Sequence, residues 1–129
     1  MSYAYDDQNV FAKILRGEIP NDTVLETDHA LAFRDLHPQA PTHVLVIPKG
    51  AYVSFDHFAS EASEAEVVDY TRAIAQVCRM EGVSLTAGEG FRMISNAGHH
   101  GVQEVPHLHV HILGGRPMGR MLARVADPQ

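Results

Sequence analysis

The sequence predicts an α+β fold in which a five-stranded antiparallel sheet carries a short N-terminal helix and one long helix. Three observations lead to this class: five short strand-like runs, short connections between them, and one long stretch of helical periodicity before the last two runs. The 129 residues, 45% hydrophobic and 20% charged, supply enough apolar material for one core and match the size of one domain. We therefore expect a single domain over residues 1–129, ending in a tail over residues 116–129.

The short helix is predicted over residues 9–16. Asn9 suits the N-cap position, because its side-chain oxygen can accept a hydrogen bond from a free backbone N–H of the first turn. Gly17 and Pro20 then end the helix. Its apolar positions share one face: Val10, Phe11 and Ile14.

Three strands are predicted next. The runs 23–27 and 30–35 are separated by Asp28-His29, which is the spacing of a tight hairpin. The β-branched run 43–47 follows a proline-rich loop and stops at Pro48-Lys49-Gly50. We expect these strands to belong to the antiparallel sheet.

The long helix is predicted over residues 63–81. Ser63 and Glu66 form a capping box, and Gly82 supplies the stop. Cys78 lies on the apolar stripe of this helix, so we interpret it as a buried packing residue and not as a reactive thiol. The stripe recurs at spacings of three and four: Val67, Tyr70, Ile74, Val77 and Cys78.

The last two strands are predicted over residues 91–96 and 107–113, and the second carries a His-x-His-x-His pattern. Because alternate side chains of a strand point to opposite faces, His107, His109 and His111 share one face. The opposite face is apolar: Leu108, Val110 and Ile112. Such a pattern is typical of a strand whose back lies on the core and whose front lines a cleft.

Two other interpretations of these histidines stay open: a solvent-facing polar stripe, and a metal site. Two His spaced by one residue can bind one ion through their imidazole nitrogens. However, the outer two Cα atoms of a straight strand would lie about 13 Å apart, too far for all three rings to bind one zinc ion. The sequence has no Cys pair and no His-Glu-x-x-His motif to add a ligand, so we expect no metal and no other cofactor.

Without a metal, a row of imidazoles suits chemistry at a phosphate. A neutral imidazole is a good nucleophile and a protonated one donates two hydrogen bonds, and both forms are accessible near neutral pH. We expect one His to attack phosphorus while its charged neighbours make the site locally positive. Four glycines flank the pattern and can place backbone N–H groups around an anion: Gly98, Gly101, Gly114 and Gly115.

Charge and cysteine content exclude several function classes. Ten Lys plus Arg against sixteen Asp plus Glu give a net charge of -6, which opposes binding to nucleic acid or to an anionic membrane surface. The single cysteine excludes an internal disulfide, and no run approaches the roughly 18 apolar residues of a membrane span. Because the N-terminus is acidic and has no apolar signal region, we expect a cytosolic protein.

The order of these motifs resembles the histidine-triad (HIT) family of nucleotide-binding proteins, and within it the HINT type. The resemblance covers nearly the whole chain, and several separated motifs in one order are more specific than the triad alone. It implies a HIT-like fold, a homodimer whose sheets join into one, and cleavage of purine nucleoside phosphoramidates or related adenylylated compounds. The matching segments are residues 9–11, 17–20, 31–33, 38–48 and 96–116.

The resemblance also implies roles for the histidines. His109 would attack the α-phosphorus and form a covalent nucleotidyl-histidine, from which water releases the nucleoside monophosphate. His107 and His111 would orient His109 and stabilise or protonate phosphate and leaving-group atoms. His43 would lie behind them as a proton-relay partner.

The nucleotide-binding residues are implied in the same way. Asn96, Gly101 and Gln103 fall where the family contacts phosphate, and Asp35 falls where it binds ribose. A carboxylate suits that role, because it can accept hydrogen bonds from both ribose hydroxyls. The slot for the base would be apolar: Val10, Phe11, Ile14, Phe33, Leu36 and Leu45.

The chain departs from the family pattern in two places. Glu104 stands where many HINT-type proteins have a small hydroxyl residue, and its negative charge would face an anionic substrate. Asn9 and Ala12 occupy the positions of a zinc-binding Cys-x-x-Cys found in some relatives, so that metal site is absent. His99 and His100 have no family counterpart and are interpreted as a solvated loop.

Alternatives to the phosphoramidase function are a weakly catalytic nucleotide-binding regulator, a diadenosine polyphosphate hydrolase, and a His-based metal protein. By analogy with the family, the helix 63–81 and the strand 91–96 would form the dimer contact. Four tail residues would reach the partner's cleft: Arg116, Met118, Arg120 and Met121.

Overall fold

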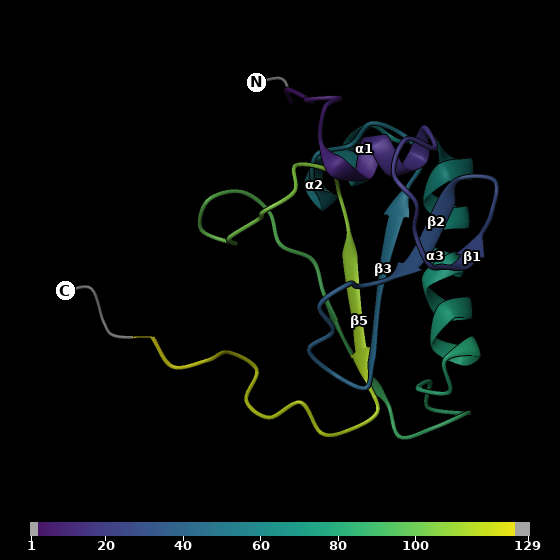
Figure 1. Cartoon of the computed structure of the whole chain (residues 1–129), viewed down its shortest axis with the longest axis vertical. Coiled ribbons are helices and arrows are strands. Elements are labelled where there is room, and N and C mark those ends of the chain that lie inside the picture. The colour runs from purple at the N-terminus through teal and green to yellow at the C-terminus, as the bar shows by residue number, and fades with distance from the viewer. Residues whose placement is uncertain (1–2, 126–129) are drawn as a thin grey trace.

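The computed structural model describes residues 3–125. The first two residues of the acidic N-terminus and the last four of the predicted tail lie outside the described residues. The elements follow one another as α1 (Val10–Leu15), β1 (Thr23–Glu26), β2 (Ala30–Arg34), β3 (Thr42–Pro48), α2 (Phe55–Glu61), α3 (Glu64–Met80), β4 (Phe91–Ile94) and β5 (Val110–Gly114), as Figure 1 shows. Within the described range, every helix falls short of the length and apolar character that a bilayer crossing requires.

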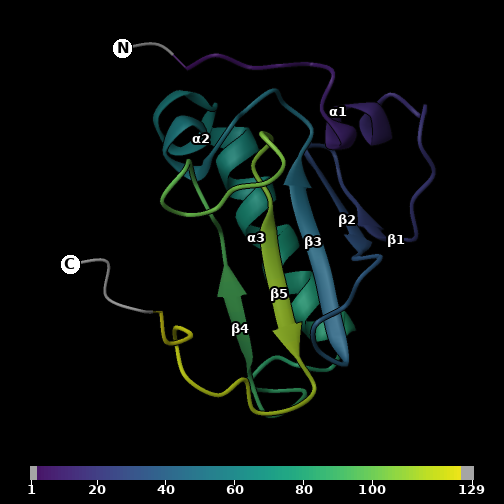
Figure 2. The same cartoon turned by 60° about the vertical axis from the view of Figure 1, so that its left-hand side comes forward.

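The strands form one antiparallel sheet in the order β1-β2-β3-β5-β4 (Figure 2). β1 and β2 form the predicted hairpin, and β5 lies between β3 and β4. The α+β class and the five-stranded antiparallel sheet are therefore confirmed. β4 and β1 are the edge strands of this sheet.

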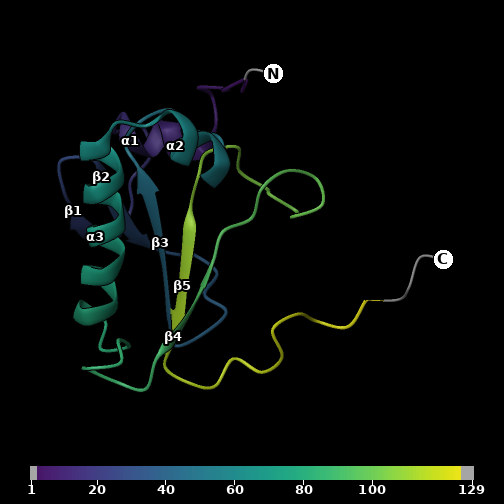
Figure 3. The same ribbon diagram turned by 180° about the vertical axis from the view of Figure 1, so that it is seen from behind.

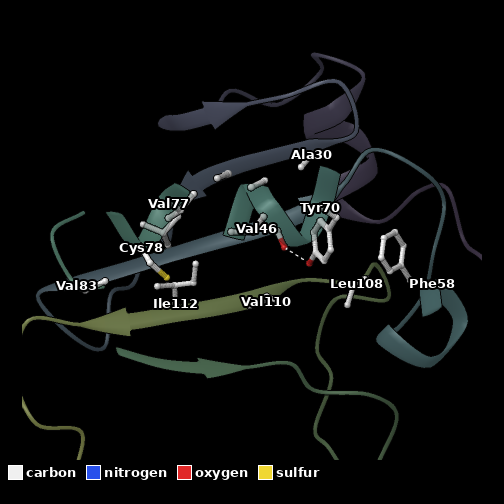
Figure 4. Packing of buried hydrophobic residues seen from close by; sticks show 13 residues of the cluster. Ala30, Val46, Phe58, Tyr70, Val77, Cys78, Val83, Leu108, Val110 and Ile112 are labelled. Atoms are coloured by element: carbon white, nitrogen blue, oxygen red, sulfur yellow. Dashed lines mark hydrogen bonds between the residues drawn. The ribbon is translucent and has the colours of Figure 1, made fainter. Parts of the chain in front are cut away.

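The long helix α3 covers one face of the sheet (Figure 3). It begins as predicted: Ser63 is the N-cap, and it exchanges both capping-box hydrogen bonds with Glu66. The Tyr70 hydroxyl donates to the Val46 carbonyl at 2.8 Å, which ties the helix to β3 (Figure 4). Cys78 is buried in this core, and burial raises the pKa of its thiol, so its predicted packing role fits.

The opposite face of the sheet, which we call the α1 face, carries the short helix at one end. Along β3 the side chains of Val44 and Val46 enter the α3 core, whereas those of Leu45 and Ile47 point to the α1 face. The second cluster of buried apolar residues lies here: Phe11, Leu31, Phe33, Leu45 and Ile47. His43 and His111 lie on the same face, beyond this apolar cluster.

Three elements differ from the prediction. β4 ends at Ile94, so Asn96 lies in the loop that follows and not in the strand predicted over residues 91–96. α2 is an additional helix, and β5 begins at Val110, so His107 and His109 precede the strand that was expected to hold them. The register pairs Val46 with Val110, which would set Pro48 opposite Leu108. Pro48 has no N–H to donate and its carbonyl accepts from Nε2 of His107, so the ladder stops and the Leu108 N–H donates to the Tyr52 carbonyl at 2.8 Å.

Candidate active site

The three histidines nevertheless share the α1 face. Leu108 lies in the α3 core with Val110 and Ile112, so the alternation continues through the segment before β5. The ring of Phe11 lies 5.0 Å from that of His109 and 6.4 Å from that of His107, between centroids. The rings of His109 and His111 are 5.0 Å apart. The predicted row of imidazoles on one side of the chain is thus present.

His107 is completely buried, with 0% of its surface exposed. Its Nε2 lies 2.9 Å from the carbonyl oxygen of Pro48, which can only accept, so Nε2 carries the ring hydrogen. Its Nδ1 lies 2.6 Å from the hydroxyl of Tyr5, which therefore donates to it. Both nitrogens are occupied, so His107 is placed to support its neighbours and not to touch a substrate.

His109 has one ring nitrogen committed to the backbone. Its Nδ1 lies 2.8 Å from the carbonyl oxygen of His107 and must donate to it. The neutral ring then keeps its lone pair on Nε2, which is the nucleophilic form. The side chain is 7% exposed, so this nitrogen sits in a largely dehydrated environment.

His43 and His111 form a directed hydrogen-bond relay. The backbone N–H of Gln39 donates to Nδ1 of His43 at 3.1 Å, so the hydrogen of the neutral His43 ring is on Nε2. That Nε2 lies 2.9 Å from Nδ1 of His111 and 3.4 Å from Oδ2 of Asp35. His111 accepts on Nδ1 and consequently presents an N–H donor at its Nε2.

All four imidazoles are held in the neutral form. Burial lowers the pKa of His107 to about 4, and burial together with neighbouring His109 and His43 lowers the pKa of His111 to about 4. Burial also lowers the pKa of His109 and of His43, although Asp35 opposes the shift in both. The expectation of charged neighbours and a locally positive site is therefore wrong for the free protein, because desolvation disfavours each cation.

One group of three potential metal ligands occurs in residues 3–125: the donor atoms of Asp35, His43 and His111 lie within 4.8 Å of one another. A metal at Nε2 of His43 would need the lone pair of that nitrogen. The Gln39 N–H already takes the lone pair on Nδ1, so Nε2 carries the hydrogen. The donor set fits a hydrogen-bonded relay better than a metal site.

Asp35 follows β2 and is partly buried beside the relay. Its Oδ1 accepts from the backbone N–H of His37 at 2.8 Å, and its Oδ2 faces His43. A carboxylate has about four acceptor positions, so lone pairs remain for further donors such as ribose hydroxyls.

Gln103 is engaged in holding the loop between β4 and β5. Its Nε2 donates to the carbonyl oxygens of Val53 at 2.6 Å and Val105 at 3.0 Å, and its Oε1 accepts from the N–H of Gly98 at 3.1 Å. Both amide hydrogens are used, so the side chain presents no free donor to a phosphate in this structure.

The same loop contains the other two predicted phosphate contacts, Asn96 and Gly101. A side-chain carbon on Gly101 would lie 2.6 Å from the carbonyl oxygen of Ala97, so the tight turn requires glycine. Asn96 is partly buried, and His99 and His100 are exposed, as the solvated-loop interpretation requires.

The predicted base slot is brought together only in part. Phe11, Phe33 and Leu45 belong to the α1-face cluster, and Ile14 packs against it. Val10 is 39% exposed and Leu36 is 87% exposed, so these two lie outside the buried cluster. Asn9 caps α1 by accepting from the Ala12 N–H.

Residues 116–120 of the predicted tail are held against their own chain. The guanidinium of Arg116 donates to the Gln39 carbonyl oxygen at 2.8 Å, and that of Arg92 donates to the carbonyl oxygens of Gly119 and Arg120. Arg116 and Met118 also line a hollow of about 730 Å³ beside the β4–β5 end that is remote from His109.

Sequence reasoning missed three contributors to the site: the hydroxyl of Tyr5, the backbone N–H of Gln39 and the carbonyl of Pro48. Two of the three act through backbone atoms, which leave no signal in residue type. Tyr5 lies 102 positions from His107, and no local pattern connects them.

Comparison with known proteins identifies the family that this fold and site define. The model of the HIT domain matches residues 16–118, and the chain belongs to the HIT family, in agreement with a HINT-like branch. A HIT family hydrolase from Legionella pneumophila has a similar structure, with a TM-score of 0.76 and 40% identity over 86% of this chain and 96% of that one. These matches confirm the predicted HIT fold and place the chain among the HIT-family hydrolases.

Two relatives match over nearly the whole length of the chain. The chain is 44% identical to the purine nucleoside phosphoramidase of Escherichia coli K12, over 91% of this chain and 95% of that protein. It is 55% identical to an uncharacterized 13.2 kDa HIT-like protein of Azospirillum brasilense, over 96% of this chain and 99% of that protein.

Proposed function

We propose that the chain cleaves a purine nucleoside phosphoramidate, or an adenylylated small molecule, at the α-phosphorus through a nucleotidyl-histidine on His109. The observation that carries this proposal is the pair of fixed tautomers, with a lone pair on Nε2 of His109 and a hydrogen on Nε2 of His111. The two rings are neighbours, 5.0 Å apart between centroids. Similarity to a purine nucleoside phosphoramidase supports the substrate class.

In the first step, Nε2 of His109 attacks the α-phosphorus and a bond from nitrogen to phosphorus forms. The bond from phosphorus to the leaving amine breaks, the amine nitrogen keeps the electron pair of that bond, and it takes a proton from Nε2 of His111. After His111 has given up its proton, His43 can donate its Nε2 hydrogen to Nδ1 of His111, because the two nitrogens already face each other. The carboxylate of Asp35, which acts to raise the pKa of His109, would stabilise the positive charge that the His109 ring gains when its Nε2 bonds phosphorus.

In the second step, water attacks the phosphorus of the intermediate and the bond to His109 breaks. The nucleoside monophosphate leaves, and the proton of the water returns to the relay through His111. Asp35 would accept hydrogen bonds from the ribose, and Phe11, Phe33 and Leu45 would line the base slot with Ile14, Leu36 and Val10 at its margin. Asn96, Gly101 and Gln103 would form the phosphate loop, with Gln103 exchanging a backbone partner for the phosphate.

Trapping the intermediate tests this function. Mixing with adenosine phosphoramidate labelled in the nucleotide, followed by a denaturing quench, should leave label on the wild-type protein and none on His109→Ala. His99→Ala is the matched control, because it removes an exposed imidazole from the neighbouring loop and should label as wild type does. Equal labelling of wild type and His109→Ala would reject the assigned nucleophile.

A nucleotide-binding regulator with little turnover is the second candidate, and Glu104 is the observation that favours it. This exposed carboxylate lies close enough to raise the pKa of His109, and it opposes an anionic substrate. In that case Asp35→Ala should weaken binding of adenosine monophosphate, whereas Glu104→Ser should leave turnover negligible. A panel that includes diadenosine polyphosphates and aminoacyl adenylates separates the remaining substrate classes.

We also propose a homodimer in which β4 joins the same strand of a second copy. β4 is an edge strand, and Phe91 and Met93 on its α3 face are 42% and 55% exposed. Val68 and Met80 on α3 are also exposed apolar residues that a partner would cover.

A cytosolic location is proposed from the single cysteine alone.

A further inference from the structure

Residues 3–8, which we call the N-terminal strap, cross the molecule above α2 and reach α1 (Figure 2). Two hydrogen bonds hold the strap at its α1 end. Nδ2 of Asn9 donates to the carbonyl oxygen of Asp6 at 2.7 Å, and Nη1 of Arg16 donates to that of Asp7 at 2.8 Å. Asn9 is buried and also caps α1, so this anchor belongs to a fixed part of the fold.

Tyr3 holds the strap at its α2 end. Its ring stacks on that of His57, with centroids 4.3 Å apart and planes 8° apart, and its hydroxyl donates to Oδ2 of Asp56 at 3.0 Å. Tyr5 lies between the two anchors. Its ring meets that of His107 edge-on, with centroids 5.6 Å apart.

The direction of the bond between Tyr5 and His107 follows from the second nitrogen of the imidazole. Nε2 of His107 must donate to the Pro48 carbonyl, so Nδ1 has a lone pair and the Tyr5 hydroxyl is the donor at 2.6 Å. Tyr5 and Pro48 thus fix the ring from both sides. His107 also supplies the backbone carbonyl that accepts the Nδ1 hydrogen of His109 at 2.8 Å.

We propose that Tyr5 is a positioning residue for catalysis: by donating to His107 it holds the carbonyl that keeps the nucleophilic nitrogen of His109 aimed at phosphorus. The proposal rests on the proposed function of His109. Its physical basis is that nucleophilic attack requires close alignment of the reacting atoms, so a small rotation of the His109 ring is costly. The strap supplies this constraint from outside the strands that carry the triad.

Tyr5→Phe removes only the hydroxyl and tests the proposal directly. We expect kcat for adenosine phosphoramidate to fall roughly 10- to 100-fold, with KM within about threefold of wild type, because alignment and not binding is lost. Tyr3→Phe is the matched control, since it removes a hydroxyl from the same strap without touching His107, and its kcat should equal that of wild type. An equal effect of both substitutions would overturn the proposal.

A double-mutant cycle shows whether Tyr5 acts through His107. In a His107→Gln background, Tyr5→Phe should change kcat less than about twofold, because the group that it positions is gone. A further 10-fold loss in that background would overturn the proposal, because Tyr5 would then act by another route.

NMR of the imidazole nitrogens separates this inference from the proposed function. In wild type, Nδ1 of His107 should show the ¹⁵N shift of a hydrogen-bonded acceptor, and the Nδ1 proton of His109 should exchange slowly. Tyr5→Phe should move the first signal toward that of a free acceptor and speed exchange of the second, whereas Tyr3→Phe should change neither. These signals exist whether or not the protein cleaves phosphoramidates, and unchanged spectra in Tyr5→Phe would overturn the positioning role.

Discussion

At the level of single residues, His109 combines burial with a fixed ring orientation. Desolvation lowers its pKa and keeps the ring neutral at pH 7, and the hydrogen bond to the His107 carbonyl leaves the lone pair on Nε2. A nucleophile that is already neutral and oriented needs little reorganisation before it attacks phosphorus. The site of this acidic protein thus offers a phosphate the oriented N–H groups and lone pairs of neutral imidazoles, and not positively charged side chains.

The pH dependence of kcat/KM follows from this protonation state. Protonation of His109 occupies its Nε2 lone pair, so kcat/KM should fall as the pH drops through the lowered pKa, with the midpoint of the fall below pH 6.5. Glu104→Gln should move this fall to lower pH by about half a unit or less, because the exposed carboxylate raises the pKa of His109. Glu89→Gln is the control at the remote end of the sheet. A fall with its midpoint at or above pH 6.5 would contradict the lowered pKa of His109.

At the level of secondary-structure elements, caps and chain breakers made α1 and α3 predictable. Asn9 caps α1, and the Ser63 capping box begins α3, both as the residue types indicate. β5 is shorter than its apolar alternation predicts, because the shortening depends on Pro48 in a different strand. α2 is short, and its Ser54 makes no capping bond to the helix backbone, so its signal was weak.

The capping box makes a measurable contribution to α3. Ser63→Ala should lower the free energy of unfolding by about 1 kcal/mol, because it leaves a backbone N–H at the helix start without its acceptor. Urea unfolding measures the change, and labelling at His109 should stay at the wild-type level. Gln76→Ala, an exposed change within the same helix, should alter stability by less than about 0.5 kcal/mol. Equal stability of Ser63→Ala and wild type would refute the assigned cap.

At the level of the whole molecule, the sheet separates stability from chemistry. α3 and the larger core occupy one face, whereas α1, the smaller cluster and the histidines occupy the other. Alternation along the chain predicts that the three residues of the triad share one face, whereas His43 could be named only from the family resemblance. Their protonation states could not, since these depend on burial and on Tyr5, Gln39 and Pro48, which lie far away in the sequence or act through the backbone.

The proposed dimer gives a prediction at the same scale. Met93→Glu should shift the protein toward monomer in sedimentation or light-scattering measurements, because a charge would be buried where β4 meets its partner. Phe55→Glu, an exposed apolar position on α2, is the control and should leave self-association unchanged. A wild-type protein that is monomeric at high concentration would reject the dimer.

In the proposed reaction, one nitrogen of one ring, Nε2 of His109, forms the covalent bond to phosphorus. Mass spectrometry of the wild-type protein, quenched during turnover of adenosine phosphoramidate and digested under conditions that preserve phosphorus–nitrogen bonds, tests it most directly. We expect a single adenylyl adduct, assigned by fragmentation to His109 and to neither His107 nor His111. An adduct on another residue, or turnover with no adduct at any quench time, would contradict it.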